Sequence, residues 1–311
     1  MARISPSGGN LERMKRMIQQ RLQQDAQQTE EALISSLPAK GGLQNRVVEA
    51  MDYALLGGGK RIRAALVLEF ARVCGVQDDR ALPFACAVEM VHAYSLIHDD
   101  LPCMDNDDMR RGKPSCHKAF GEDIALLAGD GLLSLAFETL LSSDARAIGA
   151  QNMLMAAREL AWASGAEGMV GGQVIDLESE GRQIDRETLE AMHRGKTGAM
   201  IVVSALLGCY AAGADVSCRD AARAYASRIG MAFQIIDDIL DVEGDAAQLG
   251  KPTGSDAQNQ KTTFYTLLGP DAARAEAARL TQEAKAAVQQ KFGAAGDVLC
   301  DLADYLLSRT H

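Results

Sequence analysis

The sequence predicts an all-α fold, a single-domain helical bundle around a central cavity, on three observations. Alternating runs of β-branched residues, the pattern of half-buried strands, are scarce along the 311 residues. Residues that favour helices, among them Ala, Leu, Met, Gln, Glu and Arg, dominate most segments. No internal linker is long enough to separate two domains and no repeat period is visible, so we expect one domain over residues 1–311.

Amphipathic or apolar patterns mark the helices of the first half of the chain. Pro38 stops the first helix, and the glycines at 57–59 close the second. Pro83 is tolerated because it falls in the first turn of its helix. The helical ranges expected here are 11–37, 45–56, 60–74, 80–100, 123–142 and 145–164.

Glycines and capping residues mark the boundaries in the rest of the chain. The glycine-rich run 168–172 is expected to interrupt the chain, and residues 111–114 are expected to be loop. Asp185 is suited to cap the next helix, which Gly195 and Gly198 should disturb. The later elements expected are a helix over 185–212, a helix over 216–243, a polar loop over 244–261, and two helices that end near Ser308.

Composition excludes several classes of function. Apolar content is 47% and charged content 24%, values typical of a soluble globular protein. The net charge of −10 argues against nucleic acid or an anionic membrane as partner. The longest charge-free run, 197–214, is short for a membrane span and predicts a buried helix instead. Seven cysteines without a C-x-x-C pair indicate a reduced, cytoplasmic protein.

A dense cluster of charge ends the long apolar helix. Five carboxylates fall within residues 99–108, and two arginines follow at once. Clustered oxygens of this kind are usually neutralised by a hard divalent cation such as Mg²⁺. Pro102 prevents a continuous helix, so the backbone should loop and bring Asp105 back near Asp99. A calcium-binding loop does not fit, because the sixth position counted from Asp105 is Arg110 rather than glycine.

A second acidic cluster lies far downstream. Asp237 and Asp241 are four residues apart on a predicted helix, so they share a face about 6 Å apart, and Gln234 shares it one turn earlier. A solvated acidic helix end is the plain alternative, but the apolar residues around this cluster indicate that the segment is mostly buried. Two such clusters with scattered basic residues indicate a polyphosphate held through metal ions.

The basic residues near position 60 predict an anion site. Glycines 57–59 precede Lys60 and Arg63, which point together at a helix start, while Arg61 points elsewhere. The spacing is not that of a Walker loop, and an ordinary solvated helix start remains the alternative. His92, two turns before the first acidic cluster and on its face, is open to either ligand binding or packing.

Together these residues resemble a trans-isoprenyl diphosphate synthase, and the chain is most similar to the bacterial short-chain farnesyl and geranylgeranyl type. The likeness runs from about residue 45 to 268. The segments that carry it are 58–63, 99–105 with 110–112, 171–173, 196–198 and 233–241. Two departures stand out, since Ala64 replaces a usual Pro and Gly195 replaces a usually larger residue.

The resemblance implies an isoprenoid synthase fold, a homodimer and a prenyltransferase that binds three Mg²⁺ ions. The implied metal ligands are Asp99 and Asp105 for two ions and Asp237 for the third, with Asp100 and Asp241 in support. The residues implied to hold the allylic diphosphate are Arg110, Lys196, Gln234, Lys251 and Lys261. Those implied to hold isopentenyl diphosphate are Lys60, Arg63, His92 and Arg111. Thr197 would offer oxygen to the developing cation, so Lys196, Thr197 and Gln234 are the expected catalytic residues.

Product length should be set below the first acidic cluster. Tyr94 lies five residues before Asp99, about 7.5 Å deeper along the helix, where a ring would close the pocket. In the family a large aromatic residue there is associated with a fifteen-carbon product, farnesyl diphosphate. Ser95 beside it is small and adds little to that floor. A geranylgeranyl diphosphate synthase with a deeper pocket remains the alternative.

Three more distant alternatives use some of the same residues. A class I terpene cyclase has Asp-rich metal sites but needs no second diphosphate site, so Lys60, Arg63 and Arg111 argue against it. A regulatory subunit of a prenyl synthase should have lost an Asp-rich motif, and both are intact here. A metal-buffering protein would not need the basic residues.

Overall fold

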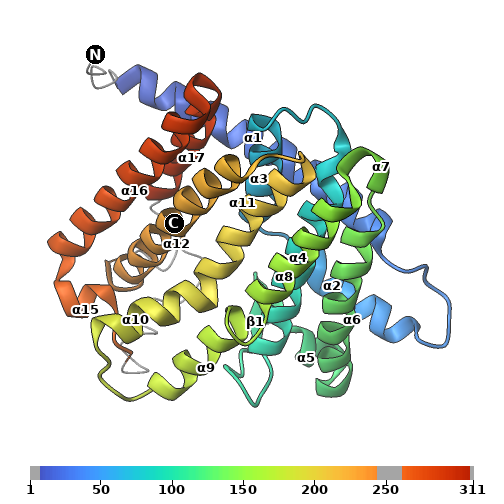
Figure 1. Cartoon of the computed structure of the whole chain (residues 1–311). Helices are drawn as coiled ribbons and strands as arrows, with labels where there is room; N and C mark the ends of the chain where they lie inside the picture. Colours follow the sequence, from blue (N-terminus) through green and yellow to red (C-terminus); the bar gives the residue numbers. More distant parts are fainter. Residues whose placement is uncertain (1–7, 244–260, 309–311) are drawn as a thin grey trace.

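The computed structural model describes residues 8–243 and 261–308, and within them the protein is helical apart from one short hairpin (Figure 1). This confirms the predicted all-α fold. The helices of the first half are α1 (Gly8–Ser36), α2 (Asn45–Leu55), α3 (Ile62–Val73), α4 (Leu82–Asp99), α5 (Cys116–Phe120), α6 (Glu122–Leu141), α7 (Ala145–Ile148) and α8 (Ala150–Ser164). The later helices are α9 (Met169–Ser179), α10 (Arg186–His193), α11 (Ala199–Ala211), α12 (Val216–Glu243), α15 (Phe264–Leu268), α16 (Pro270–Phe292) and α17 (Asp297–Leu307).

Several expected boundaries are wrong, and backbone dihedrals explain them. The third helix begins at Ile62 rather than 60, because Arg61 has a left-handed φ of 49°. The range 145–164 is two helices, since Gly149 adopts a φ of 90° between α7 and α8. Of the run 168–172 only Gly168 lies at the break between helices, as the N-cap residue of α9, because the later glycines lie inside α9.

The expected loop at 111–114 is part of a hairpin. Strands β1 (Met109–Arg110) and β2 (Lys113–Pro114) pair antiparallel. Arg111 and Gly112 connect them with φ values of 52° and 76°, the positive dihedrals that a two-residue hairpin turn requires. The turn therefore fixes where the two arginines of the first motif lie.

The disturbance expected at Gly195 and Gly198 is confirmed as a π-helical segment, η2 (Arg194–Gly198), between α10 and α11. Asp185 caps α10 as predicted, because its side chain accepts a hydrogen bond from the Thr188 N–H at 2.9 Å. The short α15 before the last two helices was not expected. The predicted loop 244–261 falls outside the described residues except for Lys261.

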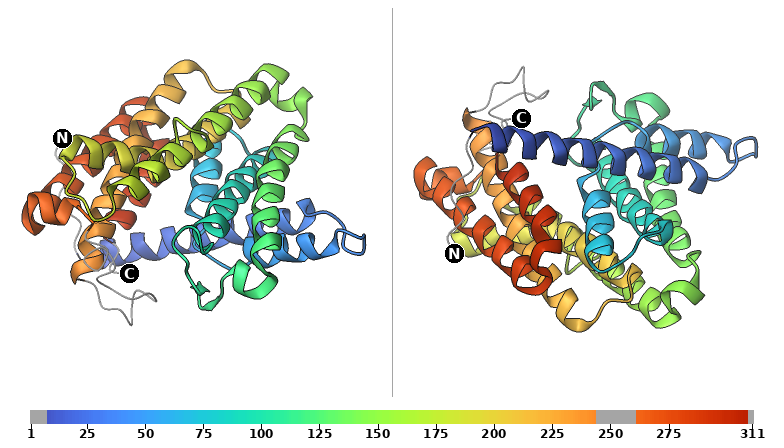
Figure 2. Two further views of the ribbon diagram at one scale, coloured as in Figure 1. Left: turned by 90° about the horizontal axis from the view of Figure 1, so that it is seen from below. Right: turned by 90° about the horizontal axis from the view of Figure 1, so that it is seen from above.

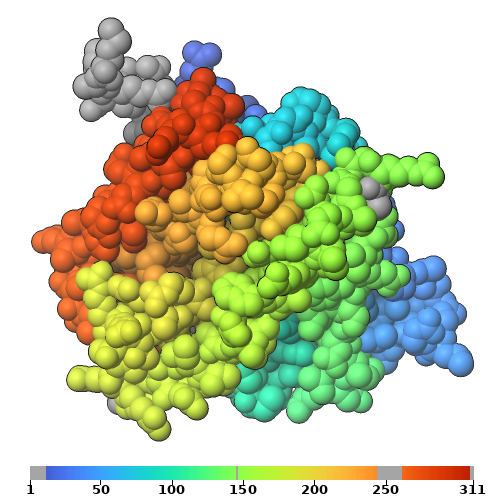
Figure 3. Space-filling view, viewed as in Figure 1, coloured from blue at the N-terminus to red at the C-terminus, as the bar shows by residue number. Residues whose placement is uncertain are grey.

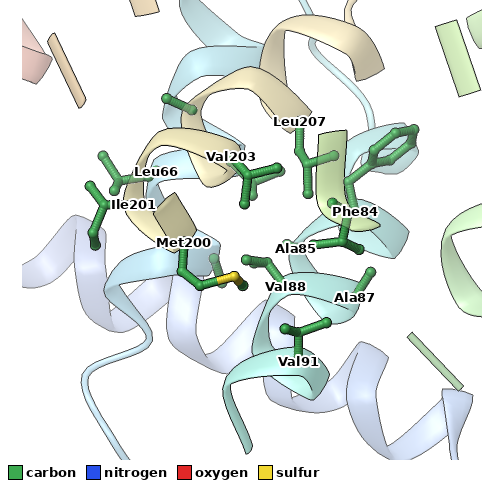
Figure 4. Close-up of a cluster of buried hydrophobic side chains, with 14 of the residues drawn as sticks. Leu66, Phe84, Ala85, Ala87, Val88, Val91, Met200, Ile201, Val203 and Leu207 are labelled. Carbon is green, nitrogen blue, oxygen red and sulfur yellow. The ribbon is translucent and has the colours of Figure 1, made fainter. Parts of the chain in front are cut away.

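The core forms where α11 packs between α3 and α4. Leu66, Val88, Val203 and Leu207 interlock there, and all are almost fully buried (Figure 4). Gly208 allows the closest approach, since a Cβ on it would overlap the backbone of α3. These contacts bring the ends of three helices that carry predicted site residues into one rigid frame.

The remaining helices enclose this frame. Figures 1 and 2 show the C-terminal pair α16 and α17 on one side, beside α12, and α6 on the other, beside α4. α1 crosses the outside of the bundle and contacts α3, α4 and α17. Among the helices of the described ranges, α6 alone is long and apolar enough to span a membrane by length and composition, a test that core helices also pass.

Candidate active site

The first acidic motif folds as the sequence predicts. α4 ends at Asp99, and the chain turns so that the Asp105 N–H donates to the Asp99 carbonyl at 2.8 Å. Asp99 is half-buried, and burial, aided by the nearby carboxylates of Asp105 and Asp100, raises its pKa to about 6. A carboxylate held partly out of water beside others is stabilised by a cation.

Asp100 and Arg110 bind one another in this structure. Asp100 is buried, and the Arg110 Nε donates to its two oxygens at 3.1 and 3.2 Å. Arg110 also reaches Asp107 at 3.4 Å. The pair joins the end of α4 to the hairpin, so the two residues predicted to support metal and substrate here fix the shape of the motif.

The second acidic motif lies on the last turns of α12. Asp237 is half-buried and Asp241 is buried, and the Gln234 side-chain amide lies 3.5 Å from Asp237. Asp238, to which the sequence analysis gave no role, accepts a hydrogen bond from the Phe264 N–H at 2.7 Å. It therefore anchors α15 against α12, while its neighbours face the pocket.

The two motifs meet across a polar pocket of about 330 Å³. Its lining comes from the first motif, α9, the π-helical segment, α12 and the residues before α15. The lining residues are Asp105, Asp176, Met192, His193, Lys196, Gln234, Asp237, Asp238, Asp241, Lys261, Thr262 and Thr263. Metal-ligand and phosphate-binding candidates that lie far apart in the sequence are thus gathered in one place.

Asp176 organises the cations of this pocket, and sequence reasoning missed it. It is buried on α9, and it accepts from Lys196 Nζ at 2.5 Å and from Lys261 Nζ at 3.1 Å. Burial opposes ionisation of Asp176, but the two ammonium groups outweigh it and lower the pKa. Its place three residues after Gln173, in the motif already recognised, was the signal that could have identified it.

Close contact between two glycines places Lys196. A Cβ on Gly172 of α9 would overlap the Lys196 backbone nitrogen, and a Cβ on Gly195 would lie 2.9 Å from the Gly172 Cα. Gly195 thus allows the π-helical segment to contact α9 closely. In the same segment Thr197 donates to the Gln234 Oε1 at 3.0 Å, so the three predicted catalytic residues are adjacent.

His193 forms the wall between the π-helical segment and α12. It is buried, its Nε2 has no hydrogen-bond partner among the described residues, and its ring stacks on Phe264. Burial lowers the pKa of His193 to about 4, so the ring is neutral near pH 7. A neutral ring adds no charge to the polar pocket beside it.

A second, basic site lies at the start of α3. Arg111 donates to the Gly58 carbonyl, and the neighbouring Gly59 has a φ of 129°, a backbone conformation that favours glycine. Arg63 has a buried Nε with no hydrogen-bond partner among the described residues. Burial and the neighbouring Arg63 and Arg111 lower the pKa of His92 far below its usual range. An anion would satisfy these groups.

Arg61 points away from this site, as predicted, and has a structural partner. It is buried and pairs with Glu89 of α4 at 3.2 Å, and it donates to the Leu55 carbonyl at 2.6 Å. Glu89 also accepts the Ala64 N–H at 3.1 Å. A proline at position 64 would have no N–H, so this bond needs a residue other than proline there.

The oxygen donors of the polar pocket fit magnesium. No three His, Cys, Asp or Glu side chains in ranges 8–243 and 261–308 converge closely enough to hold an ion unaided. This arrangement suits Mg²⁺, which usually takes one or two carboxylates together with water and substrate phosphates. The number of ions, and the role of each predicted ligand, stay predictions.

Tyr94 and Ser95 lie on α4 below the first motif. Tyr94 is buried in the core, with the His98 ring edge-on to it at a centroid distance of 5.4 Å. A Cβ on Gly129 of α6 would overlap the His98 ring, so the absence of a side chain at position 129 leaves room for that ring. Ser95 Oγ donates to the His92 carbonyl at 2.9 Å. Lys251, a predicted diphosphate ligand, lies outside the described residues.

A larger cavity of about 930 Å³ lies behind the π-helical segment, between α9, α10, α12 and α16. Figure 3 shows a recess between the yellow α10 and the orange α12. Apolar side chains and arginine–glutamate pairs line it, and no carboxylate of either Asp-rich motif does. The chemistry that the motifs predict therefore belongs to the smaller polar pocket.

Known proteins are similar to this chain over most of its length. A family model described as polyprenyl synthetase matches residues 44–298. Farnesyl diphosphate synthase of Bacillus subtilis is 42% identical over 287 residues, which are 92% of this chain and 97% of that protein. Large subunit 1 of the chloroplastic heterodimeric geranylgeranyl pyrophosphate synthase of Arabidopsis thaliana is 44% identical over 291 residues, 91% of this chain and 77% of that protein.

A solved structure shares the fold over nearly the whole chain. The apo crystal structure of an FPP/GFPP synthase from Zymomonas mobilis superposes with a TM-score of 0.84 at 39% sequence identity. The match covers 94% of this chain and 100% of that one.

Proposed function

The chain belongs to the polyprenyl synthetase family as a short-chain prenyl diphosphate synthase, and on that premise we propose that it makes mainly farnesyl diphosphate. It would condense isopentenyl diphosphate head-to-tail with dimethylallyl diphosphate and then with geranyl diphosphate. The observation that carries the proposal is the polar pocket, in which Asp105 of one motif faces Asp237 and Asp241 of the other beside two lysines.

The pocket would hold the allylic diphosphate. Asp99, Asp105 and Asp237 would bind Mg²⁺, supported by Asp100 and Asp241. When bound, Mg²⁺ neutralises the charge of the diphosphate and makes it a better leaving group. Lys196 and Lys261, aimed by their shared bonds to Asp176, would add fixed positive charge on the departing oxygens.

The chemical step needs no protein nucleophile. The allylic C–O bond breaks with both electrons on the diphosphate, leaving a delocalised carbocation. The isopentenyl double bond attacks its terminal carbon, and the departing diphosphate takes the proton that is lost. Thr197 Oγ1, already bonded to Gln234, would place oxygen beside the cation. The apolar residues of the bundle exclude water that would trap it.

The basic site would hold isopentenyl diphosphate. Lys60, Arg63 and Arg111 supply positive charge, and the unpartnered Nε of Arg63 would gain an acceptor. A neutral His92 can donate one hydrogen bond without adding to the repulsion among the arginines. This second site favours a prenyltransferase over a terpene cyclase, which binds a single diphosphate.

Product length is the finer part of the proposal. Tyr94, buried beneath Asp99 and braced by His98, would stop the chain at fifteen carbons. A geranylgeranyl diphosphate synthase is the second candidate, because relatives of both descriptions match at 42–44% identity. The intact Asp-rich motifs argue against a regulatory subunit.

We also propose a cytoplasmic homodimer that binds no nucleic acid. Large apolar side chains are exposed on α6 and α8, which suits a face that a second copy covers. They are Leu126, Leu127, Leu141, Leu154 and Trp162. Such a partner would also account for the apolar composition of α6. All seven cysteines are free, as in a reducing compartment.

A product assay tests the function. The purified protein is mixed with isopentenyl and dimethylallyl diphosphates and Mg²⁺, and the products are sized by mass spectrometry. Fifteen-carbon chains support the whole proposal, and twenty-carbon chains keep the reaction but reject Tyr94 as the stop. Absence of condensation by folded protein, with Mg²⁺ present, would reject the prenyltransferase.

A further inference from the structure

Three cysteines from three helices gather at the end of the molecule opposite the polar pocket. Cys74 follows α3 directly, Cys209 lies near the end of α11, and Cys218 lies in the first turn of α12. The Sγ atoms of Cys74 and Cys209 are 3.9 Å apart, although 135 residues separate them. The Cys209 Sγ also lies 3.9 Å from the Cys218 carbonyl oxygen.

The packing of rigid helices enforces this meeting. Gly208, one residue before Cys209, brings α11 into backbone contact with α3 and so carries the thiol to the end of that helix. Asp215 caps the first turn of α12 by accepting the Cys218 N–H at 2.8 Å, and Lys291 of α16 lies 3.5 Å from the same carboxylate. The approach of the thiols is therefore a fixed feature of the core and not a chance contact of surface chains.

The surroundings distinguish the two paired thiols. Cys74 is partly exposed, and the hydrogen bond with Cys209, aided by Cys218 and the charge of Lys291, lowers its pKa against the opposing effect of burial. Cys209 is fully buried, and the same hydrogen bond together with burial raises its pKa well above the usual value. An accessible thiol that ionises more readily, beside a buried thiol within reach, is the arrangement of an attacking and a resolving cysteine.

We propose that Cys74 and Cys209 are a peroxide-sensitive modification site that closes a disulfide between α3 and α11. The Cys74 thiolate attacks one oxygen of a hydroperoxide, the O–O bond breaks, and the leaving oxygen departs as water or an alcohol. The resulting sulfenic acid is attacked by the Cys209 sulfur, which forms the S–S bond, and the S–O bond breaks to release water. Two thiols are oxidised by two electrons, and the peroxide is reduced.

The geometry limits what must move. A disulfide has an S–S length of about 2.05 Å, so the two sulfurs, now 3.9 Å apart, must approach by about 2 Å. Lys60 and Arg63 lie at the other end of α3, and Lys196 and Thr197 lie just before α11, about three turns from Cys209. We therefore expect the disulfide to link α3 to α11 without changing the geometry of either proposed diphosphate site.

The test uses the full-length protein oxidised with hydrogen peroxide, alkylated and mapped by mass spectrometry. Trypsin leaves Cys209 and Cys218 on one peptide, 197–219, so a second cleavage before Asp215 separates them. The expected product is the Cys74 peptide joined to the Cys209 peptide, lighter by about 2 Da than the sum of the free peptides. Exposed Cys103 reports ordinary thiol oxidation in the same sample.

Variants separate the proposal from its rivals. Cys74→Ser must abolish the linked peptide, while Cys218→Ser must keep it. In the linked protein we expect Tm to rise by about 5–10 °C, reversed by dithiothreitol, with turnover retained. A Cys74–Cys218 link would overturn Cys209 as the partner. Oxidation of Cys103 with both Cys74 and Cys209 still alkylatable, or Cys74 driven to sulfonic acid without a link, would overturn the site.

Discussion

Two clusters of buried charge in this protein are built differently. The N-terminal ion cluster joins α1 to α3 through Arg21, Asp25, Glu69 and Arg72. The pocket cluster joins Asp176 of α9 to Lys196 and Lys261 beside the acidic end of α12. In the first, Arg72 donates to Asp25 at 2.5 and 3.0 Å and to Glu69 at 2.7 Å, and Arg21 completes the pairing of Glu69.

The two clusters differ in how their positive and negative groups are arranged. The N-terminal ion cluster has two guanidinium groups for two carboxylates, so its charges balance, and Arg72 holds Asp25 by forked hydrogen bonds. In the pocket cluster two lysines share Asp176, with the Glu180 carboxylate 3.8 Å from Lys261, and further carboxylates, Asp105, Asp237 and Asp241, face the same polar pocket. A cluster whose charges balance within it serves stability, whereas charges of both signs gathered around a polar pocket suit a ligand that carries phosphate and metal. Substitutions in the two clusters should therefore have opposite consequences.

The largest effect is expected from Asp237→Asn. The substitution keeps the shape of the side chain and removes a charge that the proposed function assigns to Mg²⁺. Turnover should fall by about 1,000-fold or more, equivalent to about 4 kcal/mol of transition-state stabilisation. Steady-state kinetics at saturating Mg²⁺ measure it, and Tm should stay within a few degrees of the parent.

Chelation of divalent ions with EDTA should reproduce that loss in the unaltered protein, and added Mg²⁺ should restore turnover. Near-normal turnover of the variant would remove Asp237 from the metal site.

Asp25→Ala in the N-terminal ion cluster should give the reverse pattern. The change leaves Arg72 half-buried with one of its two carboxylate partners, and it should lower the free energy of unfolding by about 2–4 kcal/mol. Urea unfolding followed by circular dichroism measures the loss, and turnover per folded molecule should be unchanged. A kinetic defect in fully folded protein would show that the two clusters are not independent.

Asp176→Asn tests the link between pairing and function inside the pocket cluster. Removing the charge weakens the bonds of Lys196 and Lys261 to their shared acceptor, so both ammonium groups are less firmly positioned in the pocket. We expect turnover to fall by about 10–100-fold, since misplacing the two lysines should slow the reaction less than losing a metal ligand does. The kinetic constants for each substrate measure it.

Glu178→Gln is the matched control, because Glu178 is an exposed carboxylate two residues further along α9. Its turnover should equal that of the parent. If both variants lose activity equally, net charge near α9 and not the pairing of Asp176 would explain the loss.

Most of the fold followed from local patterns, and the failures have local causes. Pro38 and the capping residue Asp185 placed the end of α1 and the start of α10 closely, because each acts on its own backbone. The left-handed dihedral of Arg61 and the inclusion of Gly172 within α9 were not predictable, since both depend on neighbours. Arg61 is held by Glu89, and Gly172 is packed against Gly195.

The candidate site divides in the same way. Residues recognised by type and spacing, such as Asp105 and Asp237, do face one pocket. Asp176 and Asp238 were missed because their roles are partnerships across the fold, with two lysines and with the Phe264 N–H. Arg110 was expected to face substrate, and its bond to Asp100 appears only once the hairpin is formed.

The smallest expected effect concerns the buried Tyr94, which lies on α4 below Asp99 and forms no ion pair. Tyr94 is 8% exposed, and its ring meets His98 edge-on. Tyr94→Ala should open space below Asp99 and shift the main product from fifteen to twenty carbons, with total turnover changed by about tenfold or less. Selectivity of this kind rests on only about 1–3 kcal/mol of apolar contact. Mass analysis of the products made from isopentenyl and geranyl diphosphates measures the shift.

Tyr94→Phe keeps the ring and should keep the parent's product. Ser95→Ala should also leave the product unchanged, because the Ser95 hydroxyl is bonded within its own helix. If the Tyr94→Ala enzyme still makes mainly fifteen-carbon product, other residues of α4 or α6 close the pocket. The charged site would still drive the reaction, but the product length would be set by apolar residues other than Tyr94.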